Sequence, residues 1–145
     1  MSLQTDRIFY KALRANTSLM ATLGNRLYNT AIPMPEEQAQ NTPAPYVIIS
    51  FLGFSNDQST KDSYEGGIDH VQVGITIVAE DRKKLGALVD TIRTTIESYC
   101  DEATPDMEDF GEVPTDYALT GTDILYDEKK PAVHMQLLYA CDVNK

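Results

Sequence analysis

The stretch that decides the fold is His70-Val71-Gln72-Val73-Gly74-Ile75-Thr76-Ile77. Branched apolar residues alternate here with polar or small ones, and this period of two predicts a strand that buries one face. Such a strand needs helices or a second sheet to cover its apolar side.

The residues that follow predict the helix that provides this cover. Asp81 is a suitable N-cap, and behind it apolar residues recur at steps of three and four up to about Cys100. The stripe consists of Leu85, Leu88, Val89, Ile92, Ile96 and Tyr99. We expect this long helix to lie with its stripe on the sheet.

Two helices and one strand are expected before residue 70. Residues 5–15 carry apolar side chains at helical spacing. A second, shorter helix is expected next, with Asn16, Thr17 and Ser18 as candidate cap residues at its start and Gly24 at its C-cap position. After a proline-rich stretch, Tyr46 to Leu52 form a β-rich apolar run of strand length.

Two further strands are expected after the long helix, at about Tyr117 to Tyr126 and Ala132 to Cys141, joined by a polar hairpin loop. The order α-α-β-β-α-β-β favours one α+β domain over residues 1–145, with a mostly antiparallel four-stranded sheet and helices packed on one face. Residues 33–45, 53–67 and 101–116 are expected to be mobile loops, because prolines dominate the first, small polar residues the second and acidic residues the third.

The charge balance limits what the chain can bind. Its 12 basic and 22 acidic residues give a net charge of -10, which repels nucleic-acid phosphates and anionic membranes. The sequence also lacks the roughly 20 consecutive apolar residues that span a bilayer. We therefore expect neither sequence-specific nucleic-acid binding nor a membrane partner. The start shows no signal-peptide pattern, so secretion is not indicated and we expect a cytoplasmic setting.

The sequence provides no catalytic or cofactor constellation. His70 and His134 fall on different expected strands, with no nucleophile motif near either of them. Cys100 and Cys141 have neither metal-knuckle nor disulfide-framework spacing, so we expect reduced thiols that pack as small apolar groups. We expect no metal, no cofactor and no enzyme activity, and a function that depends on protein contacts.

One segment concentrates the acidic charge of the chain. Residues 101–116 hold seven acidic residues and no basic one, namely Asp101, Glu102, Asp106, Glu108, Asp109, Glu112 and Asp116. A solvated acidic face is the simplest interpretation of such a run. The alternatives are a DNA mimic that blocks a basic partner and a Ca²⁺ or metal-enzyme site, although the EF-hand spacing is absent.

Several short patterns occur in a specific order. They are Leu23-Gly24-Asn25-Arg26-Leu27-Tyr28, Pro43-Ala44-Pro45-Tyr46-Val47-Ile48 and Val71-Gln72-Val73-Gly74-Ile75, followed by the amphipathic helix. From about Arg7 to Leu138 the chain thereby resembles the tail-completion, or tail terminator, family of long-tailed bacteriophages. The resemblance implies a virion protein that forms a homo-hexameric ring, ends the tail tube and joins it to the head connector. A head–tail connector or neck subunit is the alternative.

The same resemblance suggests roles for two of the expected loops. A mobile loop at residues 53–67 could order on a neighbouring subunit, so its candidate interface residues are Asn56, Asp57, Ser59, Lys61 and Tyr64. The acidic segment departs from the family pattern in length and charge. On a ring lumen it would let DNA pass without sticking, because like charges give no gain from counterion release.

Overall fold

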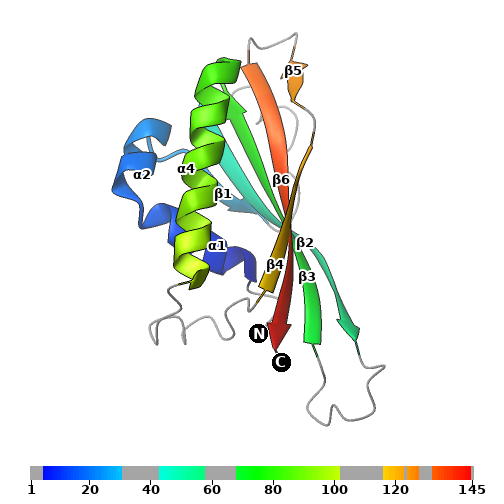
Figure 1. Ribbon diagram of the computed structural model, residues 1–145. Coiled ribbons are helices and arrows are strands. Elements are labelled where there is room, and N and C mark those ends of the chain that lie inside the picture. Colours follow the sequence, from blue (N-terminus) through cyan, green and yellow to red (C-terminus); the bar gives the residue numbers. More distant parts are fainter. Residues whose placement is uncertain are drawn as a thin grey trace.

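The structure is a computed structural model that describes residues 5–30, 43–57, 68–101, 116–122, 124–127 and 132–144. Figure 1 shows a twisted sheet that carries the helices on one face. The described helices are α1 (Thr5–Arg14), α2 (Thr17–Leu23) and α4 (Arg82–Asp101). The described strands are β1 (Leu27–Thr30), β2 (Tyr46–Asp57), β3 (Ile68–Ala79), β4 (Asp116–Gly121), β5 (Leu125–Asp127) and β6 (Ala132–Asn144).

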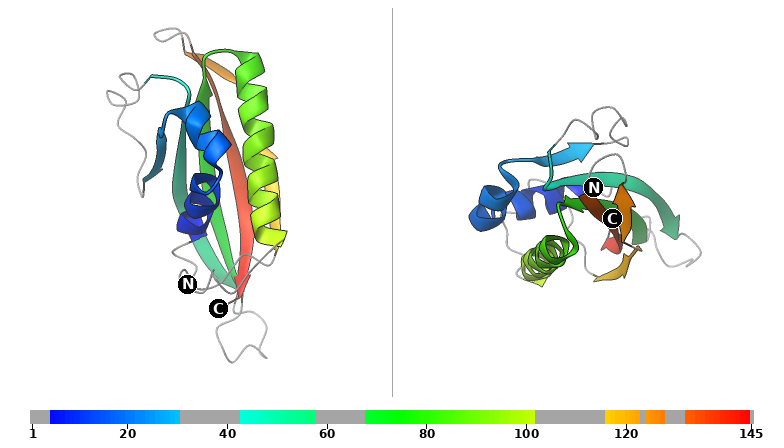
Figure 2. Two further views of the ribbon diagram at one scale, coloured as in Figure 1. Left: turned by 90° about the vertical axis from the view of Figure 1, so that its left-hand side faces the viewer. Right: turned by 90° about the horizontal axis from the view of Figure 1, so that it is seen from above.

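The sheet has the order β1-β2-β3-β6-β4, and β5 also pairs with β6. Strand β1 runs parallel to β2, whereas every other pair of described strands is antiparallel. The long strands β2, β3 and β6 form its centre, and β1 and β4 lie at opposite edges (Figure 2). The predicted α+β fold with a mostly antiparallel sheet and helices on one face is therefore confirmed.

The core lies between the helices and the inward rows of the central strands. Val71, Val73, Ile75 and Ile77 are buried on β3, as the alternation predicts. They face the helical stripe of Leu85, Leu88, Ile92 and Ile96, which is also buried. Strand β6 adds Leu137, Tyr139 and Cys141, and the Tyr139 ring packs edge-on against Phe9 of α1 at a centroid distance of 5.2 Å.

Polar contacts fix the short helix α2 between its neighbours. The Asn16 side chain accepts a hydrogen bond from the Leu19 backbone N–H at 3.1 Å, so Asn16 is the one of the three predicted candidates that caps α2. Its Nδ2 donates to the Thr95 hydroxyl of α4 at 3.0 Å. At the other end Gly24 adopts φ 59°, a left-handed conformation that suits glycine at a helix C-terminus.

The structure contains one strand that the sequence does not predict. Leu27–Thr30 is too short and too polar to show an alternating pattern, yet it pairs with β2. Arg26 places this strand, because its carbonyl accepts from the Val47 N–H at 3.1 Å and its Nε donates to the Pro45 carbonyl at 3.0 Å. The expected strand at Tyr117 to Tyr126 is instead divided into β4 and β5.

The expected loop at residues 53–67 is wrong for its first five residues. Strand β2 continues to Asp57, because β3 offers a complete row of backbone partners from Ile68 onward. Residues 58–67 lie outside the described part of the chain, as do residues 33–42 and 102–115 of the other two expected loops. The expected loop at residues 101–116 is wrong at its two ends, because Asp101 ends α4 and Asp116 begins β4.

Candidate assembly surfaces

One end of the molecule consists of strand ends that reach beyond the helices (Figures 1 and 2). We call it the hairpin end and define it by Gly53–Asp57 of β2, Ile68–His70 of β3 and Asp142–Asn144 of β6. Within this end β2 and β3 stay paired as far as Asp57 and Ile68. Because no helix covers it, the hairpin end depends on backbone pairing more than on core packing.

A β-bulge separates the hairpin end from the rest of β2. Phe51 pairs with Val73 and Gly53 pairs with Gln72, so Leu52 is the extra residue. Gly53 has φ 152°, in the region that side-chain-bearing residues avoid. Leu52 is 47% exposed on the helix-free face, where its Cδ1 lies 3.1 Å from the point that a Cβ on Gly74 would occupy.

The structure places the predicted interface residues only in part. Asn56 and Asp57 are the last residues of β2 and pair with Asp69 and Ile68. Ser59, Lys61 and Tyr64 belong to residues 58–67, outside the described part of the chain. Asp57 and Ile68, the described residues on either side of this stretch, form the last pair at the tip of the hairpin end.

The acidic segment joins the sheet at the same end. Asp116 is the first residue of β4 and pairs with Asp142 of β6, and Asp142 pairs with His70 of β3. Glu102, Asp106, Glu108, Asp109 and Glu112 lie outside the described residues. The predicted interface loop, which follows Asp57, and the acidic segment, which ends at Asp116, therefore both adjoin the sheet at the hairpin end.

The two histidines do not form a pair. His134 lies opposite Val78, whereas His70 is eight positions away on β3, about 26 Å at 3.3 Å per residue. Cys141 is buried in the core, as expected of a thiol that packs as a small apolar group. Within the described ranges no three His, Cys, Asp or Glu residues gather closely enough to hold a metal ion. None of the helices described here is long and apolar enough to cross a membrane.

Two grooves lie beside the helices. The first has a volume of about 320 Å³ and runs between α2, Pro45 and α4, with Leu19 and Leu88 in its lining. The second has a volume of about 590 Å³ and is lined by Arg7, Tyr10, Lys11, Arg14, Ala15 and Asn29. We call it the basic groove. Its cations occur at residues 7, 11 and 14. This helical spacing is visible in the sequence, although no site was predicted from it.

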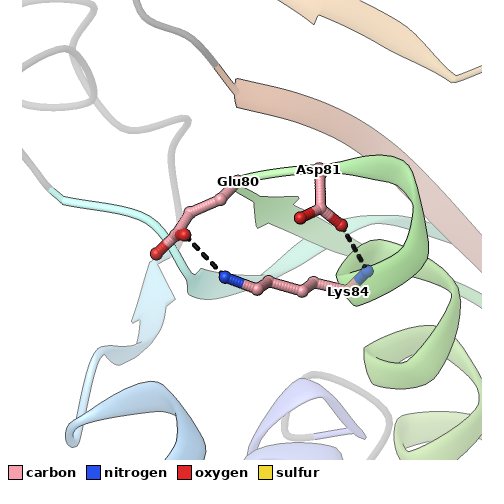
Figure 3. Close-up of polar contacts among 3 residues, drawn as sticks. All are labelled: Glu80, Asp81 and Lys84. Carbon is pink, nitrogen blue, oxygen red and sulfur yellow. Dashed lines mark hydrogen bonds and ion pairs between the residues drawn. The ribbon is translucent and has the colours of Figure 1, made fainter.

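The rim of the first groove includes the start of α4 (Figure 3). Asp81 caps the helix, accepting from the Lys84 backbone N–H at 2.8 Å. Lys84 Nζ lies 2.7 Å from Glu80 Oε2, and this hydrogen-bonded pair raises the pKa of Lys84. Both side chains of the pair are more than half exposed, so solvent screens their attraction.

The fold and these surfaces define a class of protein, a small α+β domain whose distinctive features are an uncovered strand end and charged surfaces. The chain belongs to the family described as tail completion protein gp17, which matches residues 9–138. It is a structural protein of a phage tail and a component of the phage particle. The resemblance predicted from the sequence is thereby confirmed.

A solved structure shares the fold. The chain is similar to a chain of the "Virion of native gene transfer agent (GTA) particle", with a TM-score of 0.60 and 15% identity over 97% of this chain and 94% of that chain. At this identity the likeness establishes the fold alone. No curated protein sequence matches the chain.

Proposed function

We propose that six copies of the chain assemble into a ring that ends the tail tube and joins the tail to the head connector. The family match over residues 9–138 is the observation that carries this proposal. The hairpin end supports it, because uncovered strands that extend beyond a helical cover give neighbouring subunits a surface to engage.

The proposal includes no chemical step. Its partners are further copies of the chain, the tail-tube protein and the head connector, and it requires no cofactor. The DNA-mimic and metal-enzyme alternatives find no comparable support in the family. A neck subunit differs from the proposed one only in the ring on which it docks.

Light scattering over a concentration series, followed by electron microscopy, tests the ring. Six chains of 16.1 kDa give about 97 kDa, and cyclic symmetry predicts a closed particle at that mass. Capture on purified tail-tube protein rather than on the connector ring then separates a terminator from a neck subunit. A chain that remains monomeric even with tail-tube protein present would refute the proposal.

A further inference from the structure

The basic groove is unusual in a chain of net charge -10. Arg7, Lys11 and Arg14 follow one another at i, i+4 and i+7 on α1, so they lie on one side of the helix. Arg7 and Arg14 are exposed and Lys11 is partly exposed. The groove therefore presents a quarter of the 12 basic residues of the chain within two helical turns.

Neighbouring residues position the groove and its charge. The Arg14 guanidinium donates to the Tyr10 hydroxyl at 3.1 Å and lies 5.9 Å from the centre of the Tyr10 ring. Asn29 lines the groove from β1, the strand at one edge of the sheet. The groove is thus a feature between a helix and a sheet edge, where an extended segment of another chain has room to lie.

The acidic segment has the complementary charge and joins the opposite edge. Residues 101–116 carry seven acidic residues and no basic one, and they lead into β4 at Asp116. Strands β1 and β4 are the two ends of the path β1-β2-β3-β6-β4. A contact between different surfaces at opposite edges is the head-to-tail type that closes subunits into a ring.

We propose that the basic groove is the docking site for residues 101–116 of a neighbouring copy of this chain. The proposal rests on the ring proposed above and identifies one contact within it. Arg7 and Lys11 are about 6 Å apart along α1, since four residues rise about 1.5 Å each. Two extended residues cover about the same distance and place their side chains on the same side of the segment. The spacing from Asp106 to Glu108 therefore matches the spacing from Arg7 to Lys11.

Charge reversal tests this contact in the full-length chain. The groove variant is Arg7→Glu/Lys11→Glu/Arg14→Glu, and the segment variant is Asp106→Lys/Glu108→Lys/Asp109→Lys. We expect each variant alone to lose the assembly that the wild type forms, because like charges then face each other. An equimolar mixture should restore it, because each groove then meets an oppositely charged segment of the other variant.

A matched control separates this contact from a general effect of charge. Arg82→Glu/Lys83→Glu/Arg93→Glu changes the same residue types by the same charge at exposed positions of α4. This control should assemble as the wild type does, and circular dichroism should show all the variants folded. A groove variant that assembles normally overturns the proposal. So does a mixture of the two variants that fails to assemble. The mixture is expected to fail if residues 101–116 dock on their own chain or line a ring lumen.

A second readout does not depend on ring formation. A synthetic peptide of residues 101–116, followed by fluorescence polarisation, should bind the wild-type chain and should bind Arg7→Gln/Lys11→Gln/Arg14→Gln at least about tenfold more weakly. Arg82→Gln/Lys83→Gln/Arg93→Gln should bind it as the wild type does. A wild-type chain that stays monomeric but shows this binding pattern would refute the proposed ring and support the docking site. If the ring forms but the peptide does not bind, the proposed docking site is refuted while the ring is not.

Discussion

Asp6 shows how a single residue influences the stability of the domain. Among the described residues it is the one charged side chain that is buried, with 8% of its surface exposed. Burial raises the pKa of its carboxyl group, although the backbone N–H groups of Asp6 and Arg7, the charge of Arg7 and the Asn29 side chain oppose that shift. The carboxylate is therefore less stable in the folded chain than in the unfolded one.

The stability effect of Asp6 depends on pH. The pKa of Asp6 in the folded chain lies above the usual 3.8. Below pH 3.8 the carboxyl group is protonated in both states, and its burial then does not lower the free energy of unfolding. As the pH rises through the folded pKa, the unfolded chain binds fewer protons than the folded one, so this stability is lost. Asp6→Asn should therefore raise the free energy of unfolding at pH 7, and the gain should shrink as the pH falls towards 4. Urea denaturation at several pH values measures this change.

Asp90→Asn is the control, since it removes one negative charge from an exposed position of α4. It should show a smaller gain than Asp6→Asn at pH 7. An Asp6→Asn chain that is less stable than the wild type at pH 7 would mean that the hydrogen bonds to the carboxylate outweigh the cost of its burial.

At the level of elements, the bulge in β2 sets the geometry of the hairpin end. One extra residue, Leu52, separates the pair formed by Phe51 from the pair formed by Gly53. Bulges bend a strand and increase its local twist. The direction in which residues 53–57 leave the sheet therefore depends on a backbone conformation that glycine allows.

Two glycines provide a paired test of that conformation. A Cβ on Gly53 or on Gly86 would have no heavy atom within 4 Å, so neither substitution by alanine creates a clash. Gly53→Ala should lower the free energy of unfolding by about 1 to 3 kcal/mol, because φ 152° is strained for alanine. Gly86→Ala in α4 should raise it by up to about 1 kcal/mol through helix propensity. Urea denaturation compares the two, and equal effects would show that the Gly53 backbone is unimportant.

The long elements were predictable because each carries its own periodic pattern. The alternation from Val71 to Ile77 and the stripe from Leu85 to Tyr99 both follow from which side chains the sheet buries. The caps of α2 at Asn16 and Gly24 were also predictable, since they depend on neighbouring residues alone.

The elements that were missed depend on distant partners. Residues 53–57 have the composition of a loop, and their strand exists because residues 68–72 pair with them. Strand β1 requires β2, which begins 16 positions after the last residue of β1. Composition identifies the acidic segment in the same way. It could not show that β4, which follows this segment, pairs with β6 at the hairpin end, because that position depends on the strand order.

On the scale of the whole molecule, the connection between β2 and β3 is expected to act in assembly rather than in folding. Replacing residues 58–67 by Asn-Gly should preserve the fold, because Asp57 and Ile68 already pair and a two-residue turn can join paired strands. We expect the free energy of unfolding to change by less than about 1 kcal/mol. Ring formation, followed by light scattering, should be lost.

The matching control shortens the connection at the opposite end of the sheet. Asp127 and Ala132 also pair, so residues 128–131 can be replaced by the same Asn-Gly turn. This variant should still form rings. If the variant without residues 58–67 assembles as well, the tip of the hairpin end is not a subunit interface, and Ser59, Lys61 and Tyr64 lose their proposed role.

The central place of β6 also affects the timing of subunit production. Strand β6 lies between β3 and β4, and its Tyr139 contacts Phe9 of α1. During synthesis α1, β2, β3 and α4 all leave the ribosome before residues 132–144, so the inward rows of β3 and α4 remain incompletely packed until β6 emerges. Since a domain generally folds as a unit, this core is completed only after residues 132–144 have left the ribosome. In the ring proposed above, a chain can therefore join its neighbours only after β6 has emerged.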